Sequence, residues 1–133
     1  MAQTVTGFVD KVIQLDGEAY RYQVYLPAGY DAGKPWPVMV FLNGKGECGR
    51  DGKKQVSVGL GTALRRAPER WPFVVVFPQK PESETQWGDH QALVLATLAA
   101  TEKDYAVDPQ RRVLTGLSQG GSGSWQIGSA HAK

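Results

Sequence analysis

Apolar positions along the chain form two kinds of run. Residues 6–15 and 20–27 alternate between apolar and polar side chains, which predicts two antiparallel strands joined through a turn at residues 15–18. Residues 38–42 and 73–77 are apolar throughout, as expected for strands that are buried on both faces of a parallel sheet. The pattern therefore predicts a hairpin followed by the strands of a covered sheet.

Helical spacing separates these strands. A modest helix is predicted at about residues 56–67, and the strongest helical pattern covers residues 89–105. Asp89 stands at the start of this second helix, where it is placed to cap it. A third helix is predicted over residues 119–131, after a short strand at residues 113–114. The inner face of the 89–105 helix is expected to carry Val94, Leu98, Thr101 and Tyr105.

The order of these elements indicates the fold class. Two antiparallel strands are followed by three strand–helix steps, which is the front half of a mostly parallel, doubly wound α/β sheet. The chain has 133 residues, the length of one ordinary domain, so residues 1–133 are expected to form a single unit.

The junction before the last predicted helix carries a Gly-x-Ser-x-Gly motif, Gly116 to Gly120, with Ser118 at its centre. A serine on a sharp strand-to-helix turn is strained, and its hydroxyl stands clear of the backbone at the positive end of the helix. Such a turn leaves room only for residues with little or no side chain at Gly116 and Gly120. The motif predicts Ser118 as a nucleophile. A phosphate-binding turn at residues 120–123 is the weaker alternative, because the chain lacks the Gly-Lys-[Ser/Thr] of a P-loop.

A second glycine-rich loop, residues 43–47, follows the apolar run at residues 38–42. Together with Tyr25-Leu26-Pro27, Trp87 and the lead-in at residues 107–112, the two motifs resemble the esterase-like "predicted peptidase" branch of the α/β-hydrolases. Polyhydroxybutyrate depolymerases and feruloyl esterases are relatives of this branch. The resemblance implies a partial α/β-hydrolase fold and a carboxylic ester hydrolase that acts on a small ester without a cofactor or a metal.

The resemblance also implies residue roles. Ser118 would form the acyl-enzyme, and the backbone N–H of Gln119 would be one donor of the oxyanion hole. The other donor would come from the loop at Gly44 and Lys45. Both segments follow parallel strands, so they are expected at the same edge of the sheet.

The sequence departs from the family pattern in its loop and in its length. Asn43 stands where the family usually has histidine, which is expected to change loop bracing more than chemistry. Glu47 is expected to brace the same loop. The family places its acid and its histidine after later strands, whereas this sequence runs only fifteen residues past Ser118. The chain is therefore expected to cover only the N-terminal half of the fold.

Two histidines are candidates for the missing base. His131 lies thirteen residues beyond Ser118 on one predicted helix, about 20 Å away at 1.5 Å per residue, too far to serve it. His90 begins a helix on the rim of the site, where an exposed helix-start histidine is expected rather than a catalytic one. The acids that could orient a histidine are Asp89, Asp51 and Glu84, and the sequence does not choose among them.

Two functions remain open from the sequence. One is a serine esterase whose base and acid come from another chain, from a missing half or from His90. The other is a non-catalytic module that self-associates or pairs with a complementing chain. Residues 112–115 are expected at a sheet edge, and Trp125 and Ile127 have little to pack against, so a homo-oligomer or a complementing chain is expected.

Composition excludes several partners. The net charge is +2, with 15 basic and 13 acidic residues interspersed, which argues against a nucleic-acid surface. No apolar run approaches the roughly 20 residues of a membrane span. Cys48 is the only cysteine, so no disulfide can form within the chain. A cytoplasmic location is expected, with a secreted mature form as the alternative.

Overall fold

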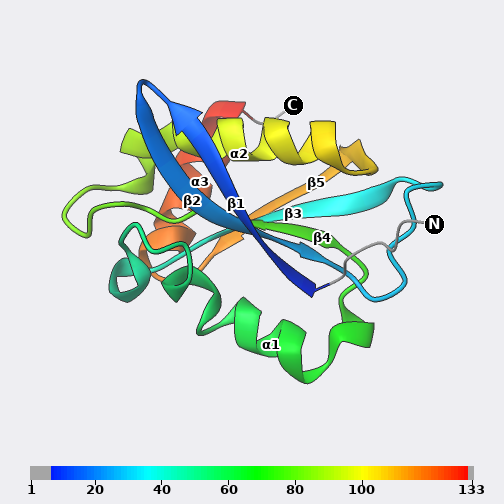
Figure 1. Cartoon of the computed structure of the whole chain (residues 1–133). Helices are drawn as coiled ribbons and strands as arrows, with labels where there is room; N and C mark the ends of the chain where they lie inside the picture. The colour runs from blue at the N-terminus through cyan, green and yellow to red at the C-terminus, as the bar shows by residue number, and fades with distance from the viewer. Residues whose placement is uncertain (1–6, 132–133) are drawn as a thin grey trace.

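The structure, a computed structural model, describes residues 7–131, with side chains through residue 129 (Figure 1). Five strands form one mixed sheet in the order β1-β2-β4-β3-β5, and helix α1 lies on the opposite side of it from α2 and α3. The strands are β1 (Gly7–Leu15), β2 (Glu18–Leu26), β3 (Trp36–Leu42), β4 (Val74–Phe77) and β5 (Val107–Gly116), and the helices are α1 (Leu60–Arg66), α2 (Gln91–Asp104) and α3 (Gln119–His131).

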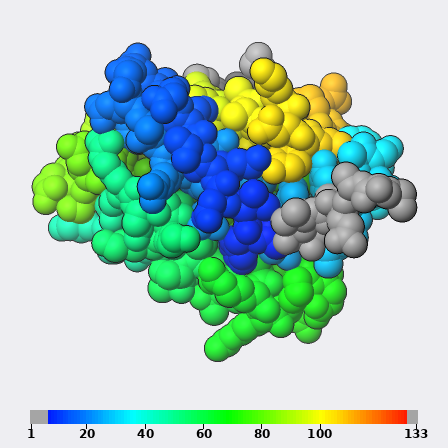
Figure 2. Space-filling model, viewed as in Figure 1, coloured from blue at the N-terminus to red at the C-terminus, as the bar shows by residue number. Residues whose placement is uncertain are grey.

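The N-terminal hairpin has the predicted form. Strands β1 and β2 pair antiparallel from Gly7 opposite Leu26 to Leu15 opposite Glu18. Asp16 and Gly17 form the turn with φ values of 52° and 82°, the positive pair that a two-residue turn between right-twisted strands needs. Residue 6, which begins the predicted first strand, lies outside the described residues. In the space-filling view the hairpin crosses one face of the molecule between the segments of α1 and α2 (Figure 2).

The two continuously apolar runs form the centre of the sheet. Strand β4 pairs antiparallel with β2 and parallel with β3, and β3 also pairs parallel with β5. Every residue of β4 is buried, because helices cover both faces of the sheet. The prediction of a hairpin followed by three strand–helix steps of an α/β fold is confirmed.

Strand β5 is longer than predicted. The sequence indicated only residues 113–114, but the strand runs from Val107 to Gly116 beside β3. Its first half contains Pro109 and Arg111, which do not fit a buried strand. They are accommodated because β5 is an edge strand, with a register shift between Trp36 and Val38 of its partner.

The helix predicted over residues 56–67 is broken into two pieces. A 3-10 turn at Lys54–Val56 precedes α1, which begins only at Leu60. Gly59, the N-cap residue of α1, separates them with a φ of 63°, a backbone conformation that favours glycine and interrupts a continuous helix. A Cβ on Gly61 would overlap the carbonyl of Val56, so the two pieces meet where no side chain fits.

The predicted cap of the best helix is wrong. Residues 87–90 form a separate 3-10 turn, and α2 begins at Gln91 with His90 as its N-cap residue. The Asp89 carboxylate accepts a hydrogen bond from the Gln86 N–H (3.1 Å), which closes the 3-10 turn. Asp89 therefore holds the segment that leads into α2 and does not cap α2 itself.

Each face of the sheet carries its own apolar core. The core under α2 and α3 contains Val40 and Val76, whereas the core under α1 contains Phe41 and Phe77. Neighbouring residues on one strand belong to different cores because side chains alternate across a sheet. No helix among residues 7–131 is both long and apolar enough to cross a membrane.

The outer edge of β5 is uncovered in the part of the chain that the structure describes, as predicted. Val113 on β5 is 42% exposed, and Trp125 on α3 is 78% exposed. The expectation that Ile127 also lacks packing partners is wrong: it is 3% exposed and belongs to the core under α2 and α3. Residues 125 and 127 face different sides of the helix because two residues correspond to about 200° of rotation.

Candidate active site

The candidate site lies where β5 turns into α3. Ser118 is exposed in this turn and has a φ of 56°, in the left-handed region that favours glycine. The one other described non-glycine residue with positive φ is the hairpin residue Asp16. Backbone strain of this kind persists only where the surrounding structure enforces it, and it is found often at functional residues.

Close packing of two glycines enforces the turn. A Cβ on Gly116 would lie 2.7 Å from the Cα of Gly120, and a Cβ on Gly120 would overlap the carbonyl oxygen of Leu42 at the end of β3. The Leu117 N–H donates to the same Leu42 oxygen (3.2 Å). The turn is therefore wedged against the end of β3, which leaves no room for a side chain at either glycine.

The glycine-rich loop after β3 lies directly beside Ser118. A Cβ on Gly44 would lie 3.5 Å from the Cβ of Ser118 and 3.2 Å from the carbonyl oxygen of Leu117. The loop continues as a 3-10 turn, Lys45–Glu47, in which the Glu47 carboxylate accepts a hydrogen bond from the Gly44 N–H (3.1 Å). The two motifs that the sequence singled out are thus in contact.

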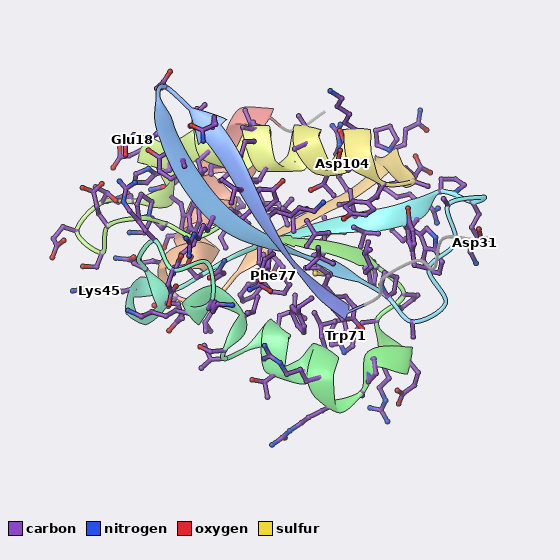
Figure 3. The ribbon with its side chains drawn as sticks, in the orientation of Figure 1. Glu18, Asp31, Lys45, Trp71, Phe77 and Asp104 are labelled. Atoms are coloured by element: carbon purple, nitrogen blue, oxygen red, sulfur yellow. The ribbon has the colours of Figure 1, made fainter. Side chains whose placement is uncertain are left out.

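Two backbone N–H groups around Ser118 are free. Neither the Lys45 N–H nor the Gln119 N–H has a hydrogen-bond partner among the described residues. The Gly44 N–H, in contrast, is occupied by Glu47. The Lys45 side chain extends outward from the body of the protein, so Lys45 offers the site its backbone and not its ammonium group (Figure 3).

Asn43 ties the glycine-rich loop to the rest of the site. Its side chain is buried, donating through Nδ2 to the Gly44 carbonyl (2.6 Å) and accepting from the Lys80 N–H through Oδ1 (3.1 Å). Its backbone carbonyl accepts a hydrogen bond from Nε1 of Trp87 (2.9 Å). Asn43 therefore braces the loop.

Gln79 holds the far end of the same loop. This buried side chain donates to the Glu47 carbonyl (3.0 Å) and to the Asp51 carboxylate (2.9 Å), and accepts from the Gly52 N–H (2.8 Å). Hydrogen bonds from the backbone of Lys53 and from Gln79 keep the pKa of Asp51 below its usual value. Asp51 is therefore committed to the loop.

His90 does not occupy the exposed position that was expected. The ring is half-buried, and its Nε2 lies 2.7 Å from the Thr85 hydroxyl. That hydroxyl also donates to the Glu82 carbonyl (3.0 Å). A hydroxyl has one hydrogen, so both contacts are satisfied when Nε2 of His90 carries the proton and donates to Thr85. No hydrogen bond joins His90 to Ser118, and in this tautomer Nε2 is not a proton acceptor.

The remaining candidates stay apart from Ser118 or outside the description. Asp89 is bound to the Gln86 N–H, and Glu84 is exposed without a partner among the described residues. The side chain of His131 lies outside the described residues. No cluster of three or more histidine, cysteine, aspartate or glutamate residues suited to a metal occurs in the described part of the chain.

Lys80 is a structural residue of the site that the sequence did not reveal. Its side chain is 0% exposed, and its ammonium group donates to the carbonyls of Glu82 and Thr85 (2.6 Å to Thr85). It thereby holds the loop that contains Ser83. The backbone carbonyl of Ser83 accepts a hydrogen bond from the side-chain amide of Gln119 (3.2 Å). A lysine that follows a strand is normally predicted to be exposed, so nothing in the local sequence indicates that Lys80 is buried.

The packing at Gly120 leads to a prediction on stability. Gly120→Val should lower the free energy of unfolding by about 3 kcal/mol or more, because the added side chain must displace the end of β3. Gly121→Ala is the matched control: its Cβ meets the nearest atom at an ordinary 3.7 Å, so its effect should stay within about 1 kcal/mol. Urea denaturation measures both, and equal midpoints for the wild type and Gly120→Val would contradict the described turn.

The environment of His90 predicts a pH dependence. Burial, and then the charge of Lys80, lower the pKa of His90 from 6.5, so the folded protein favours the neutral ring. This stabilisation is complete above pH 6.5 and is lost as the pH falls through the lower folded-state pKa. The urea midpoint should therefore fall less between about pH 7.5 and 5.5 in His90→Asn than in the wild type. An equal fall, or an NMR titration that places the pKa of His90 above 6.5, would refute the described environment.

Comparison with known proteins gives structural neighbours. No family model matches the sequence, and no curated protein matches it significantly. A thermostable esterase superposes with a TM-score of 0.74 and 26% identity over 93% of this chain and 38% of its own. A mutant of the feruloyl esterase module from Clostridium thermocellum, complexed with sinapinate, superposes with a TM-score of 0.75 and 21% identity. The match covers 93% of this chain and 49% of that structure's chain.

An S-formylglutathione hydrolase from Agrobacterium tumefaciens is also similar, with a TM-score of 0.71 and 20% identity over 97% of this chain and 56% of its own. The chain spans between about two fifths and a little over half of the structures that it matches. These neighbours are esterases of the α/β-hydrolase superfamily. The chain therefore has the α/β-hydrolase fold and spans about half of it.

Proposed function

We propose that this chain provides the nucleophile and the oxyanion-binding groups of a serine-dependent carboxylic ester hydrolase. One observation carries the proposal: the strained Ser118 lies against Gly44, between two segments that each offer a free backbone N–H, at Lys45 and Gln119. The esterase neighbours support ester hydrolysis as the reaction class.

In this mechanism Ser118 attacks the ester carbonyl carbon and loses its hydroxyl proton to a base. The carbonyl oxygen becomes an oxyanion in the tetrahedral intermediate. Collapse of the intermediate expels the alcohol, which takes up a proton, and leaves the acyl group on Ser118. Water then attacks the acyl-enzyme, the carboxylic acid leaves, and the serine is restored.

The N–H groups of Lys45 and Gln119 are assigned to the oxyanion. Gly44 belongs to the same loop, but its N–H already donates to Glu47 and is not counted as a donor. Gln119 adds the positive end of α3, because it is the first residue of that helix. Removal of one such donor typically costs a factor of 10² to 10³ in rate.

We propose that the base and the acid lie outside the described residues. His90 holds its Nε2 proton toward Thr85 and makes no contact with Ser118, so it is not proposed as the base. The matched esterases have about as much chain again as the part that superposes. A complementing segment is therefore proposed to bring the base to Ser118. The substrate is proposed to be a small carboxylic ester.

A second candidate is a non-catalytic module that associates through the open flank of the sheet. The observation that favours it is the uncovered edge of β5, together with an apolar groove that Leu95, Val113 and Leu114 help to line. Unpaired strand edges and exposed apolar patches favour association.

Ser118→Ala tests the proposed nucleophile. A fluorophosphonate probe should label the wild type once at Ser118 even without the complementing segment, because the free N–H groups of Lys45 and Gln119 stabilise the charge that develops on the phosphoryl oxygen. The serine oxygen bonds to phosphorus, fluoride leaves, and the serine proton passes to water. Ser118→Ala should take no label and lose any hydrolysis of short p-nitrophenyl esters, whereas Ser122→Ala should behave like the wild type. Intact-mass and peptide mass spectrometry measure this. Labelling that persists in Ser118→Ala would refute the assignment.

The open flank predicts self-association. At micromolar concentration, light scattering should give a mass of at least two chains. Pairing at β5 buries apolar surface, and each Å² buried stabilises the pair by about 25 cal/mol. Val113→Lys should shift the mass toward one chain, since a charge on an edge strand opposes pairing. A well-folded monomer at all concentrations would show that the flank does not drive association.

A further inference from the structure

Trp87 lies between the two segments on which the proposed function depends. Its side chain is 0% exposed and belongs to the 3-10 turn Trp87–His90 that leads into α2. The indole Nε1–H donates to the backbone carbonyl of Asn43 (2.9 Å). Asn43 begins the glycine-rich loop, two residues before Lys45, so the indole fixes the start of that loop.

The other side of Trp87 supports helix α3. A Cβ on Gly123 would lie 2.7 Å from Cγ of Trp87 and 2.9 Å from its Cδ1. Gly123 is five residues beyond Ser118, in the second turn of the helix. The helix backbone therefore rests directly on the indole, and only glycine permits this approach.

Hydrogen bonds on either side of Trp87 hold this contact in place. The Gly88 N–H donates to Oε1 of Gln126 (3.1 Å), and Nε2 of Gln126 donates to Oε1 of Gln86 (2.7 Å). Residues 86 and 88 thus both bond to Gln126 of α3, while Trp87 packs against Gly123 of the same helix. Helix α3 is held both by these hydrogen bonds and by its packing on the indole. A shift of α3 along Trp87 would therefore break the bonds of Gln126.

We propose that Trp87 is a positioning residue that sets the separation of the two oxyanion donors. The inference rests on the proposed function. One donor, the Lys45 N–H, belongs to the loop that the indole holds through Asn43, and the other, the Gln119 N–H, belongs to the helix that the indole holds through Gly123. The rigid indole ring therefore sets the positions of both the Lys45 N–H and the Gln119 N–H.

The proposal differs from a role in core filling. Trp87→Phe keeps an aromatic ring in the core but removes the Nε1–H donor, which leaves the Asn43 carbonyl without this partner. A core-filling residue would lose stability and leave the chemistry of the folded protein unchanged. A positioning residue would change the rate of reaction at Ser118 in molecules that remain folded, because a displacement of about 1 Å can slow a reaction 100-fold.

The chain offers a matched control for each variant. Trp36 is also buried, and its Nε1 donates to a backbone carbonyl, that of Asp31 (3.1 Å), at the opposite end of β3 from the site. Trp36→Phe therefore removes a similar hydrogen bond away from Ser118. Gly121→Ala is the control for Gly123→Ala, because it adds the same methyl group to the same helix without a clash.

The first measurement is the kinetics of fluorophosphonate labelling at Ser118, at a temperature where circular dichroism shows each variant folded. Trp87→Phe and Gly123→Ala should lower the limiting labelling rate by roughly tenfold to 100-fold, with the concentration of probe at half-maximal rate unchanged. Trp36→Phe and Gly121→Ala should leave both values unchanged. An unaltered limiting rate in Trp87→Phe, or an equal loss in Trp36→Phe, would overturn the proposal.

The second measurement does not depend on activity. In two-dimensional ¹⁵N–¹H spectra, Trp87→Phe should shift the backbone amides of both Lys45 and Gln119, and Trp36→Phe should shift neither. If the wild type takes no label, the proposed function fails, and these shifts alone then decide whether Trp87 couples the two segments. Unmoved amides in Trp87→Phe would overturn the coupling even if the wild type labels rapidly.

Discussion

Parallel pairing between β3 and β5 determines where everything else in the site lies. Leu42 stands opposite Gly116 in this pairing, so both strands end at the same edge and both glycine-rich segments begin there. The carbonyl of Leu42 then meets the backbone of Gly120, at a distance that excludes any side chain. Because the turn packs this tightly against the end of β3, the backbone at Ser118 is held in its strained conformation, with a φ of 56°.

Buried polar groups then fix the loops that this pairing brings together. Asn43 and Gln79 each bond to more than one segment, and the fully buried Lys80 binds two carbonyls of the next loop. Such groups are costly to bury without partners, so a satisfied network favours one arrangement of the loops over others. Preorganised N–H groups stabilise a developing charge because they need not reorient during the reaction. The network thus connects the fold to the proposed chemistry.

The sequence predicted features that depend on local pattern. The apolar run that became β4 and the motif around Ser118 could be read directly, because burial on two faces and a strained turn restrict residue types locally. The full length of β5 could not, since an edge strand tolerates the proline and charges of residues 107–112. The hydrogen bonds of Lys80 and Trp87 to Asn43 could not be predicted either. Lys80 lies 37 positions from Asn43 and Trp87 lies 44, and local sequence pattern carries no information on contacts at such separations.

The proposed function requires that Lys45 and Gln119 form one site with Ser118 for an oxyanion. A crystal structure of the protein after reaction with a fluorophosphonate tests it most directly, because the phosphoryl oxygen of the adduct stands in for the oxyanion of the tetrahedral intermediate. We expect this oxygen to accept hydrogen bonds from both N–H groups, at the roughly 2.7–3.1 Å typical of an oxyanion hole. An adduct on Ser118 whose phosphoryl oxygen points to solvent, or contacts neither N–H, would contradict it.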